Sequence, residues 1–225
     1  MSDNELAVDD MPTIVKKAWE TGQAIDLNGI GYGRLHWGNQ KDVIDSPSPY
    51  YYFLAGVVRR HNMTRILEIG THWAGATRSM YQGVSDLRKS KIVTVDITTE
   101  SDSRLAAYPD IKKFVGDGNS EEVFSKVVNE FGFEPVDLIY IDAAHQTMPV
   151  FTSFALYTMA LKPKLVIFDD VTLNEGMRKA WDLITAAVSE KNAINAADLV
   201  RAIRPSPDNP GFGVTRIESN VARGF

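Results

Sequence analysis

The sequence of 225 residues contains no cysteine, which excludes disulfides, thiolate metal ligands and a cysteine nucleophile. It also lacks any apolar run near the ~18 residues that a membrane-spanning helix needs, so we expect no membrane association. The acidic start MSDNELAVDDMPT has no apolar segment of the kind found in signal peptides. A cytoplasmic location is therefore the expectation.

An excess of positive charge is also missing. The chain carries 24 Lys and Arg against 29 Asp and Glu, which gives a formal net charge of −5. Proteins that bind nucleic acid usually need the opposite balance to meet a phosphate backbone. With 44% hydrophobic residues, the composition is that of a globular domain with a full core. A small molecule, and no nucleic acid, is the expected partner.

Short runs rich in Val and Ile alternate with amphipathic stretches from residue 65 onward, a pattern typical of β-α-β units in a parallel sheet. Strands are predicted at 65–70, 91–97, 112–118, 136–142 and 164–170. Helices are predicted at 50–61, 75–88, 120–131, 147–161 and 174–188. Two further strands at 199–204 and 211–218, joined by a turn-rich segment, predict a hairpin. The predicted fold is α/β, with a doubly wound, mostly parallel, seven-stranded Rossmann-like sheet and a C-terminal antiparallel hairpin.

The first 47 residues have a different pattern. A short amphipathic helix is predicted over 12–22, followed by a glycine-rich segment that contains His36 and Trp37. We interpret residues 1–47 as an N-terminal helical and irregular segment suited to a lid or a dimer contact. Residues 48–225 form the predicted main domain.

Doubly wound sheets bind ligands at the carboxyl ends of their strands, and distinctive residues occur there. The first predicted strand enters 68-EIGTHWAG-75, where Gly70 permits a sharp turn and the close approach of a ligand. The spacing from Gly70 to Gly75 is not the dinucleotide fingerprint G-x-G-x-x-G, which argues against a nicotinamide-dependent oxidoreductase. Asp96 ends the second strand, where a carboxylate suits ribose hydroxyls. Asp117 ends the third, where it would bind an adenine amine or form a turn.

Acids also end the fourth and fifth predicted strands. In VDLIYIDAAHQT, Asp142 is followed by His145, and KLVIFDDVTL contains Asp169 and Asp170. Carboxylate oxygens are the ligands that Mg²⁺ prefers, and histidine titrates near neutral pH. Two simpler interpretations stay open: the acids are solvated strand ends, with Asp170 capping the next helix, and His145 is structural.

In order and spacing these motifs resemble those of the class I S-adenosylmethionine-dependent methyltransferases. The resemblance covers about residues 50–218 and rests on ILEIGTHWAGAT, IVTVDI, VGDG, LIYIDAAH and PKLVIFDDV. It implies S-adenosylmethionine as cofactor, with the methionine part at the Gly70 loop, the ribose at Asp96 and the adenine at Asp117. The further residues implied at the cofactor are Glu68, Thr71, Gly75 and Asp142.

The acids at the fourth and fifth strands narrow the resemblance to the metal-assisted O-methyltransferases of the catechol, macrocin and rhamnosyl types. It implies one Mg²⁺ held by Asp142, Asp169 and Asp170, with His145 and Asp142 as catalytic groups. The implied activity is methyl transfer to a hydroxyl of a sugar or phenolic natural product, by a homodimer. The alternatives are a metal-independent N- or O-methyltransferase with His145 or Asp142 as base, and a binding module that keeps the donor pocket without chemistry.

Overall fold

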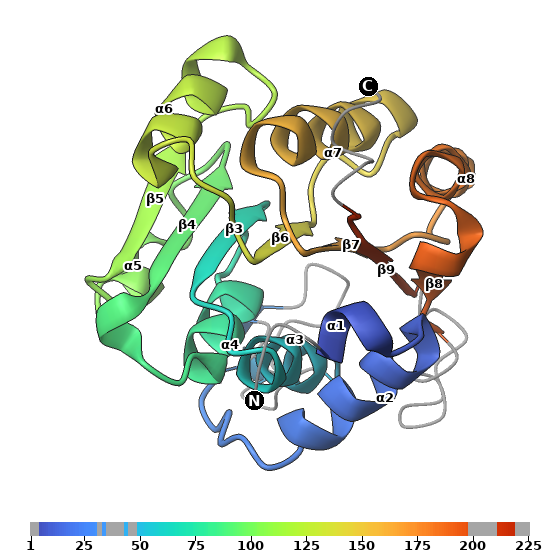
Figure 1. Ribbon diagram of the computed structural model, residues 1–225. Coiled ribbons are helices and arrows are strands. Elements are labelled where there is room, and N and C mark those ends of the chain that lie inside the picture. Colours follow the sequence, from blue (N-terminus) through green and yellow to red (C-terminus); the bar gives the residue numbers. More distant parts are fainter. Residues whose placement is uncertain (1–4, 31–32, 35–42, 45–48, 198–210, 219–225) are drawn as a thin grey trace.

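A seven-stranded sheet runs through the molecule, with helices on both faces (Figure 1). The computed structural model describes residues 5–30, 33–34, 43–44, 49–197 and 211–218. The strand order in the sheet is β5-β4-β3-β6-β7-β9-β8. These strands are β3 (Arg65–Ile69), β4 (Lys91–Asp96), β5 (Ile111–Val115), β6 (Leu138–Ile141), β7 (Leu165–Asp169), β8 (Ala193–Asn195) and β9 (Phe212–Arg216).

The sheet confirms the predicted doubly wound fold. Strands β3 to β7 pair in parallel, while β9 pairs antiparallel with both β7 and β8. The chain moves outward from β3 through β4 to β5 and then returns to β6 on the other side. The switch in strand order therefore lies between β3 and β6, where such sheets bind ligands. The predicted strand 199–204 lies outside the described residues, and β8 is the partner of β9 that the structure describes.

Side chains of the central strands alternate between two cores, as the pleat of a strand requires. On β3, Ile66 packs in one core and Leu67 in the other. Figure 1 shows the first face covered by α2 (Met11–Gly22), α3 (Pro49–Arg60) and α4 (Gly75–Gly83), and the second by α6 (Glu121–Phe131), α7 (Thr147–Leu161) and α8 (Glu175–Val188). Strand β3 is consequently buried at all positions except its first.

Local chemistry sets the ends of the helices. Helix α6 begins after Ser120, whose side chain accepts a hydrogen bond from the Val123 backbone. The cap of α8 is Asn174, so the interpretation of Asp170 as that cap is wrong; a turn separates the two residues. Helix α4 ends at Gly83, earlier than predicted, because the Arg59 guanidinium takes the last carbonyl oxygens of the helix. A short 3-10 turn, Leu87–Lys89, follows.

Residues 5–30 pack onto the main domain. The short helix α1 (Glu5–Val8) precedes α2, which lies against α3. A Cβ on Gly56 would stand 1.9 Å from the Ala18 carbonyl oxygen, so the two helices touch backbone to backbone. The Arg216 guanidinium on β9 donates to the carbonyl oxygen of Leu6 at 2.8 Å. The N-terminal helices thus share the core of the sheet.

The remaining elements are small. Strands β1 (Gly33–Arg34) and β2 (Val43–Ile44) form a separate antiparallel pair, and α5 (Asp102–Leu105) precedes β5. His36 and Trp37 lie outside the described residues, and the lid or dimer contact assigned to their segment stays a prediction. Within the described part of the chain, no helix has the length and apolarity to cross a membrane. The cytoplasmic location also stays a prediction.

Candidate active site

The structure brings the predicted acids and the histidine together at the carboxyl edge of β6 and β7. Asp142 extends β6, because its backbone N–H donates to the Ile69 carbonyl oxygen at 2.8 Å. Asp169 is the last residue of the neighbouring strand β7, and Asp170 follows it. Adjacent parallel strands that end at the same level explain why residues distant in sequence meet here.

His145 lies between two of the carboxylates. Its Nε2 atom is 3.2 Å from Asp170 Oδ2 and 3.5 Å from Asp142 Oδ1. The neighbouring Asp142 carboxylate is the main reason that the pKa of His145 is raised, and its effect outweighs the opposing effect of burial. The imidazole is therefore placed to accept a proton and to keep it.

Burial and mutual repulsion favour the protonated form of the other two acids. Burial is the largest cause that raises the pKa of Asp169 well above its usual range, followed by the charges of Asp142 and Asp170. Burial and Asp142 together raise the pKa of Asp170 to about 6, against the effect of His145. Carboxylates this close to one another need a positive charge to be fully ionised.

The loops that carry these groups have unusual backbone conformations. Ala144 and Asp170 have φ values of +58° and +57°, in the left-handed region that non-glycine residues rarely adopt. The Asn174 side chain donates to the His145 carbonyl oxygen at 3.1 Å, so the cap of α8 also fixes the histidine loop. Sequence reasoning missed this role of Asn174, whose only signal was its place at a helix start.

Tyr51 reaches the same edge from α3. A Cβ on Gly75 would stand 2.0 Å from Tyr51 Oη, so the phenol lies against the first residue of α4. Burial is the main cause that raises the pKa of Tyr51, and Asp142 and Asp169 add to it. Tyr51 is therefore a neutral phenol beside the acids. The sequence does not distinguish it within the run Tyr50, Tyr51 and Tyr52.

Gly70 connects the loop after β3 to the cluster of acids and histidine at the ends of β6 and β7. It has a φ of +101°, and a Cβ there would stand 1.8 Å from the Asp142 carbonyl oxygen. Only glycine permits this conformation and this contact. The end of β3 and the end of β6 therefore touch backbone to backbone, and the loop after β3 begins next to Asp142.

The loop Thr71–Ala74 follows, and Asp96 holds it. The His72 backbone N–H donates to Asp96 Oδ2 at 2.6 Å, while Asp96 Oδ1 accepts from the Thr98 backbone at 2.9 Å. The Thr98 hydroxyl also donates to Asp96 Oδ1 at 3.2 Å. A carboxylate has about four acceptor positions, so Asp96 retains capacity for about one ribose hydroxyl. Asp117 Oδ1 accepts from the Asn119 backbone at 2.9 Å, which is the turn-forming role; its contact with adenine stays a prediction.

Glu68 lies behind this loop. It is fully buried, and its carboxyl accepts hydrogen bonds from the hydroxyls of Thr77 and Thr94. Burial raises its pKa to about 8, and the charges of Asp142 and Asp96 contribute. Its predicted contact with the cofactor stays a prediction.

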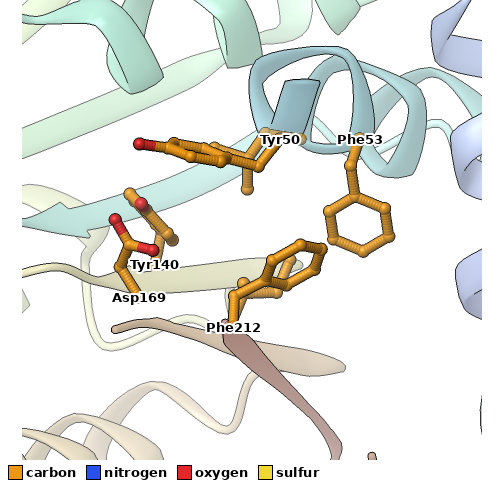
Figure 2. A pocket seen from close by; sticks show the side chains of 7 residues that line it. Tyr50, Phe53, Tyr140, Asp169 and Phe212 are labelled. Carbon is orange, nitrogen blue, oxygen red and sulfur yellow. The ribbon is translucent and has the colours of Figure 1, made fainter. Parts of the chain in front are cut away.

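A narrow hollow beside Asp169, between α3 and the sheet, has no room for a water molecule. Its lining residues are Tyr50, Phe53, Leu54, Tyr140, Ile167, Asp169 and Phe212. Figure 2 shows the oxygen atoms of Tyr50, Tyr140 and Asp169 on one side, and the rings of Phe53 and Phe212 on the other. One end of the hollow is therefore polar and the rest is apolar.

The predicted metal ligands have the type of ligand atom, carboxylate oxygen, that a hard cation prefers. Asp142, Asp169 and Asp170 supply carboxylate oxygens from neighbouring strand ends, and their repulsion shows a deficit of positive charge. In the described ranges, however, no group of three or more histidine, aspartate or glutamate side chains has an arrangement ready to hold a metal ion. His145 Nε2 stands between two of the carboxylates instead.

Comparisons with known proteins agree with the fold. Residues 67–171 match a family described as a methyltransferase domain, and many solved methyltransferases share this arrangement of strands. The chain has the class I methyltransferase fold. The match to the family covers β3 to β7 and so includes the Gly70 loop and the acids at positions 96, 142 and 169.

The individual proteins that this chain resembles are distant. The O-methyltransferase hkm8 of Aspergillus hancockii is 30% identical over 143 residues, which is 60% of this chain and 54% of that protein. The match thus spans about half the length of that relative. The O-methyltransferase TomG of Streptomyces achromogenes, solved in complex with S-adenosylmethionine, has a TM-score of 0.59 at 15% identity and covers 96% of this chain and 94% of its own. MycE, solved with Mg, S-adenosylhomocysteine and mycinamycin VI, has a TM-score of 0.51 at 18% identity and covers 76% and 48%.

Proposed function

We propose that this methyltransferase domain transfers a methyl group from S-adenosylmethionine to a hydroxyl of a small molecule. The observation that carries the proposal is the backbone contact between Gly70 and Asp142, because it joins a donor-type loop to the cluster of acids and histidine. The names of hkm8 and TomG, both O-methyltransferases, support the same activity.

The proposed roles follow from position. When bound, the donor supplies a methyl group already activated on a sulfonium. The methionine part of the donor lies against the backbone of Gly70, the loop Thr71–Ala74 and Gly75. Asp96 accepts a hydrogen bond from the ribose. The protein then has to deliver a deprotonated hydroxyl to the methyl carbon in line with the breaking bond.

His145 is the proposed proton acceptor. As the bond from the acceptor oxygen to the methyl carbon forms and the carbon–sulfur bond breaks, the hydroxyl proton moves to Nε2. Asp142 and Asp170, 3.5 and 3.2 Å from that atom, stabilise the resulting imidazolium. Asp142 is thus a catalytic group even where it does not take the proton itself.

We also propose that Asp142, Asp169 and Asp170 hold one Mg²⁺ during catalysis. These oxygens would hold a hard cation, which would lower the pKa of an acceptor hydroxyl and orient it. Burial raises the pKa of Asp169 most, and the charges of Asp142 and Asp170 add to it; this added repulsion supports the site, as does the Mg in the MycE complex.

The proposed acceptor is a sugar or phenolic natural product that presents a hydroxyl to His145 and Asp142. The hollow beside Asp169 has no room for such a molecule, so it is not assigned to the acceptor.

Turnover with defined acceptors tests the proposed function. Purified protein is incubated with S-adenosylmethionine, Mg²⁺ and either catechol-type phenols or simple sugars, and S-adenosylhomocysteine is quantified. The expected result is product formation with one of the two acceptor classes, lost in Asp142→Asn while donor binding survives. Equal rates in Asp142→Asn and the wild type would show that the acids do not perform the chemistry.

A metal-independent route is the second candidate. It is favoured by the position of His145 Nε2 between Asp142 and Asp170, which already forms an acid–base pair without a cation. A chelator distinguishes the two routes. Loss of turnover with EDTA that Mg²⁺ restores supports the three-carboxylate site, and turnover that EDTA leaves intact supports His145 alone.

A further inference from the structure

A chain of buried hydroxyls connects Glu68 to the donor loop. Thr77 and Thr94 both donate to Glu68 Oε2, the second at 2.5 Å. The hydroxyls of Thr94 and Thr71 lie 2.5 Å apart. Glu68, Thr77 and Thr94 are fully buried, and Thr71 is nearly so. The four residues come from β3, α4, β4 and the loop, so the chain ties three elements to the first loop residue.

The protons in this chain have a defined order. A hydroxyl has one proton to donate, and that of Thr94 goes to Glu68. The Thr71 hydroxyl therefore donates to Thr94. Thr77 donates to the same Glu68 oxygen from the other side but has no hydrogen bond to Thr71. Thr94 is thus on the path from Glu68 to the loop, and Thr77 is not.

The loop needs such support. His72 and Ala74 have φ values of +41° and +59°, which are unfavourable for residues with a Cβ and persist only where the surroundings enforce them. Two anchors are visible. Asp96 fixes the His72 backbone at 2.6 Å, and the Thr94 hydroxyl fixes the Thr71 side chain.

Burial raises the pKa of Glu68 and favours its neutral form, whereas the hydrogen bonds from Thr77 and Thr94 act in the opposite direction. Oε2 accepts both hydroxyls, while Oε1 has no hydrogen-bond partner among the described residues. The nearest titratable groups that act on it are Asp96, Asp142 and Tyr51. None of these compensates a negative charge on Glu68.

We propose that Glu68 is a positioning residue of the donor site, which acts through Thr94 and Thr71 to hold the loop Thr71–Ala74 in the conformation that receives the donor. This rests on the proposed function and refines it: Glu68 supports the loop from behind. The proposal singles out one side chain, because only the Thr94 hydroxyl connects Glu68 to Thr71 in this chain of hydrogen bonds.

Two matched variants test the path. Thr94→Val and Thr77→Val each remove one buried hydroxyl bonded to the same Glu68 oxygen and keep the side-chain shape. Calorimetry with S-adenosylhomocysteine is expected to show about tenfold weaker binding for Thr94→Val and a change below about twofold for Thr77→Val, consistent with one lost hydrogen bond. Thr71→Val should weaken binding as much as Thr94→Val does. The double variant Thr71→Val/Thr94→Val should lose no more affinity than either single variant. Equal losses in Thr94→Val and Thr77→Val would overturn the proposal.

Hydrogen exchange gives a readout that needs no donor. The amides of residues 71–74 are expected to exchange faster in Thr94→Val than in the wild type, and at the wild-type rate in Thr77→Val. Identical exchange in both variants refutes the path. If the wild type binds no S-adenosylhomocysteine but exchange differs as expected, the proposed function fails and the positioning role stands.

The charge state of Glu68 is tested by rescue. Glu68→Ala removes the acceptor, and Glu68→Gln offers the same carbonyl-type acceptor without a charge. Glu68→Gln is expected to recover most of the donor affinity that Glu68→Ala loses. If Glu68→Gln is as weak as Glu68→Ala, Glu68 acts as a carboxylate and the neutral-acid account is wrong.

Discussion

Glu68→Gln should change how the stability of the protein depends on pH. The pKa of Glu68 rises from an ordinary value of 4.5 to about 8 on folding, with burial as the main cause. Between these values the folded protein keeps a proton that the unfolded chain has lost, so the free energy of unfolding falls as pH rises. Glutamine does not titrate, and Glu68→Gln removes this part of the pH dependence.

The size of the effect follows from the two pKa values. One pKa unit corresponds to about 1.4 kcal/mol. Between pH 5.5 and pH 7.5 the unfolded glutamate is almost fully ionised and the folded one is mostly protonated. The wild type should therefore lose about 2 kcal/mol more stability over this interval than Glu68→Gln.

Urea unfolding at the two pH values measures this difference. Asp169, Asp170 and His145 titrate in both proteins, so their contributions largely cancel. Glu122→Gln is the matched control, because Glu122 is exposed and its pKa is lowered by the Lys126 hydrogen bond, so it is ionised at both pH values. A wild type and Glu68→Gln with the same pH dependence would refute a buried, protonated Glu68.

Three further predictions concern the site itself. Gly70→Ala should destabilise the protein by about 3 kcal/mol or more in urea unfolding, because the new Cβ meets the Asp142 carbonyl oxygen. Gly132→Ala is the control: Gly132 has a φ of +66° and open space around it, so this variant should lose only about 1 kcal/mol. Equal losses of stability in the two variants would contradict the close contact at Gly70. Asp142→Asn should lower kcat by about 100-fold or more with donor affinity retained by calorimetry, whereas a parallel loss of affinity would make Asp142 a binding residue only. The rate should rise with pH through a value above 6.5, because the raised pKa of His145 keeps the base protonated at lower pH; His145→Gln should abolish that limb, and its persistence would exclude His145 as the base.

The sequence predicted the sheet because its signals are strong. Val- and Ile-rich runs such as 91–97 can be buried on both faces only as central strands. Each run ends in a glycine or an acid that is typical of a strand end at a ligand site. Gly70 was predicted for the same reason, since a glycine after a buried strand implies a close approach. The structure supplies its cause, the carbonyl oxygen of Asp142.

The internal contacts of the site could not be predicted. Thr94 is a strong strand former, so its place in a strand gives no sign that its hydroxyl links Glu68 to Thr71. The three consecutive tyrosines are equivalent in sequence, and only the packing of α3 on Gly75 selects Tyr51. Asp170 was considered as the cap of α8, but Asn174 also has a capping side chain, and the turn between them makes Asn174 the cap.

Calorimetric titration of the wild type with S-adenosylhomocysteine tests the central claim most directly. The loop after β3, Asp96 and the edge beside Asp142 together form the proposed donor site. The account predicts saturable binding with one site per chain, weakened strongly by Gly70→Ala. Absence of binding by a folded wild-type protein would contradict it.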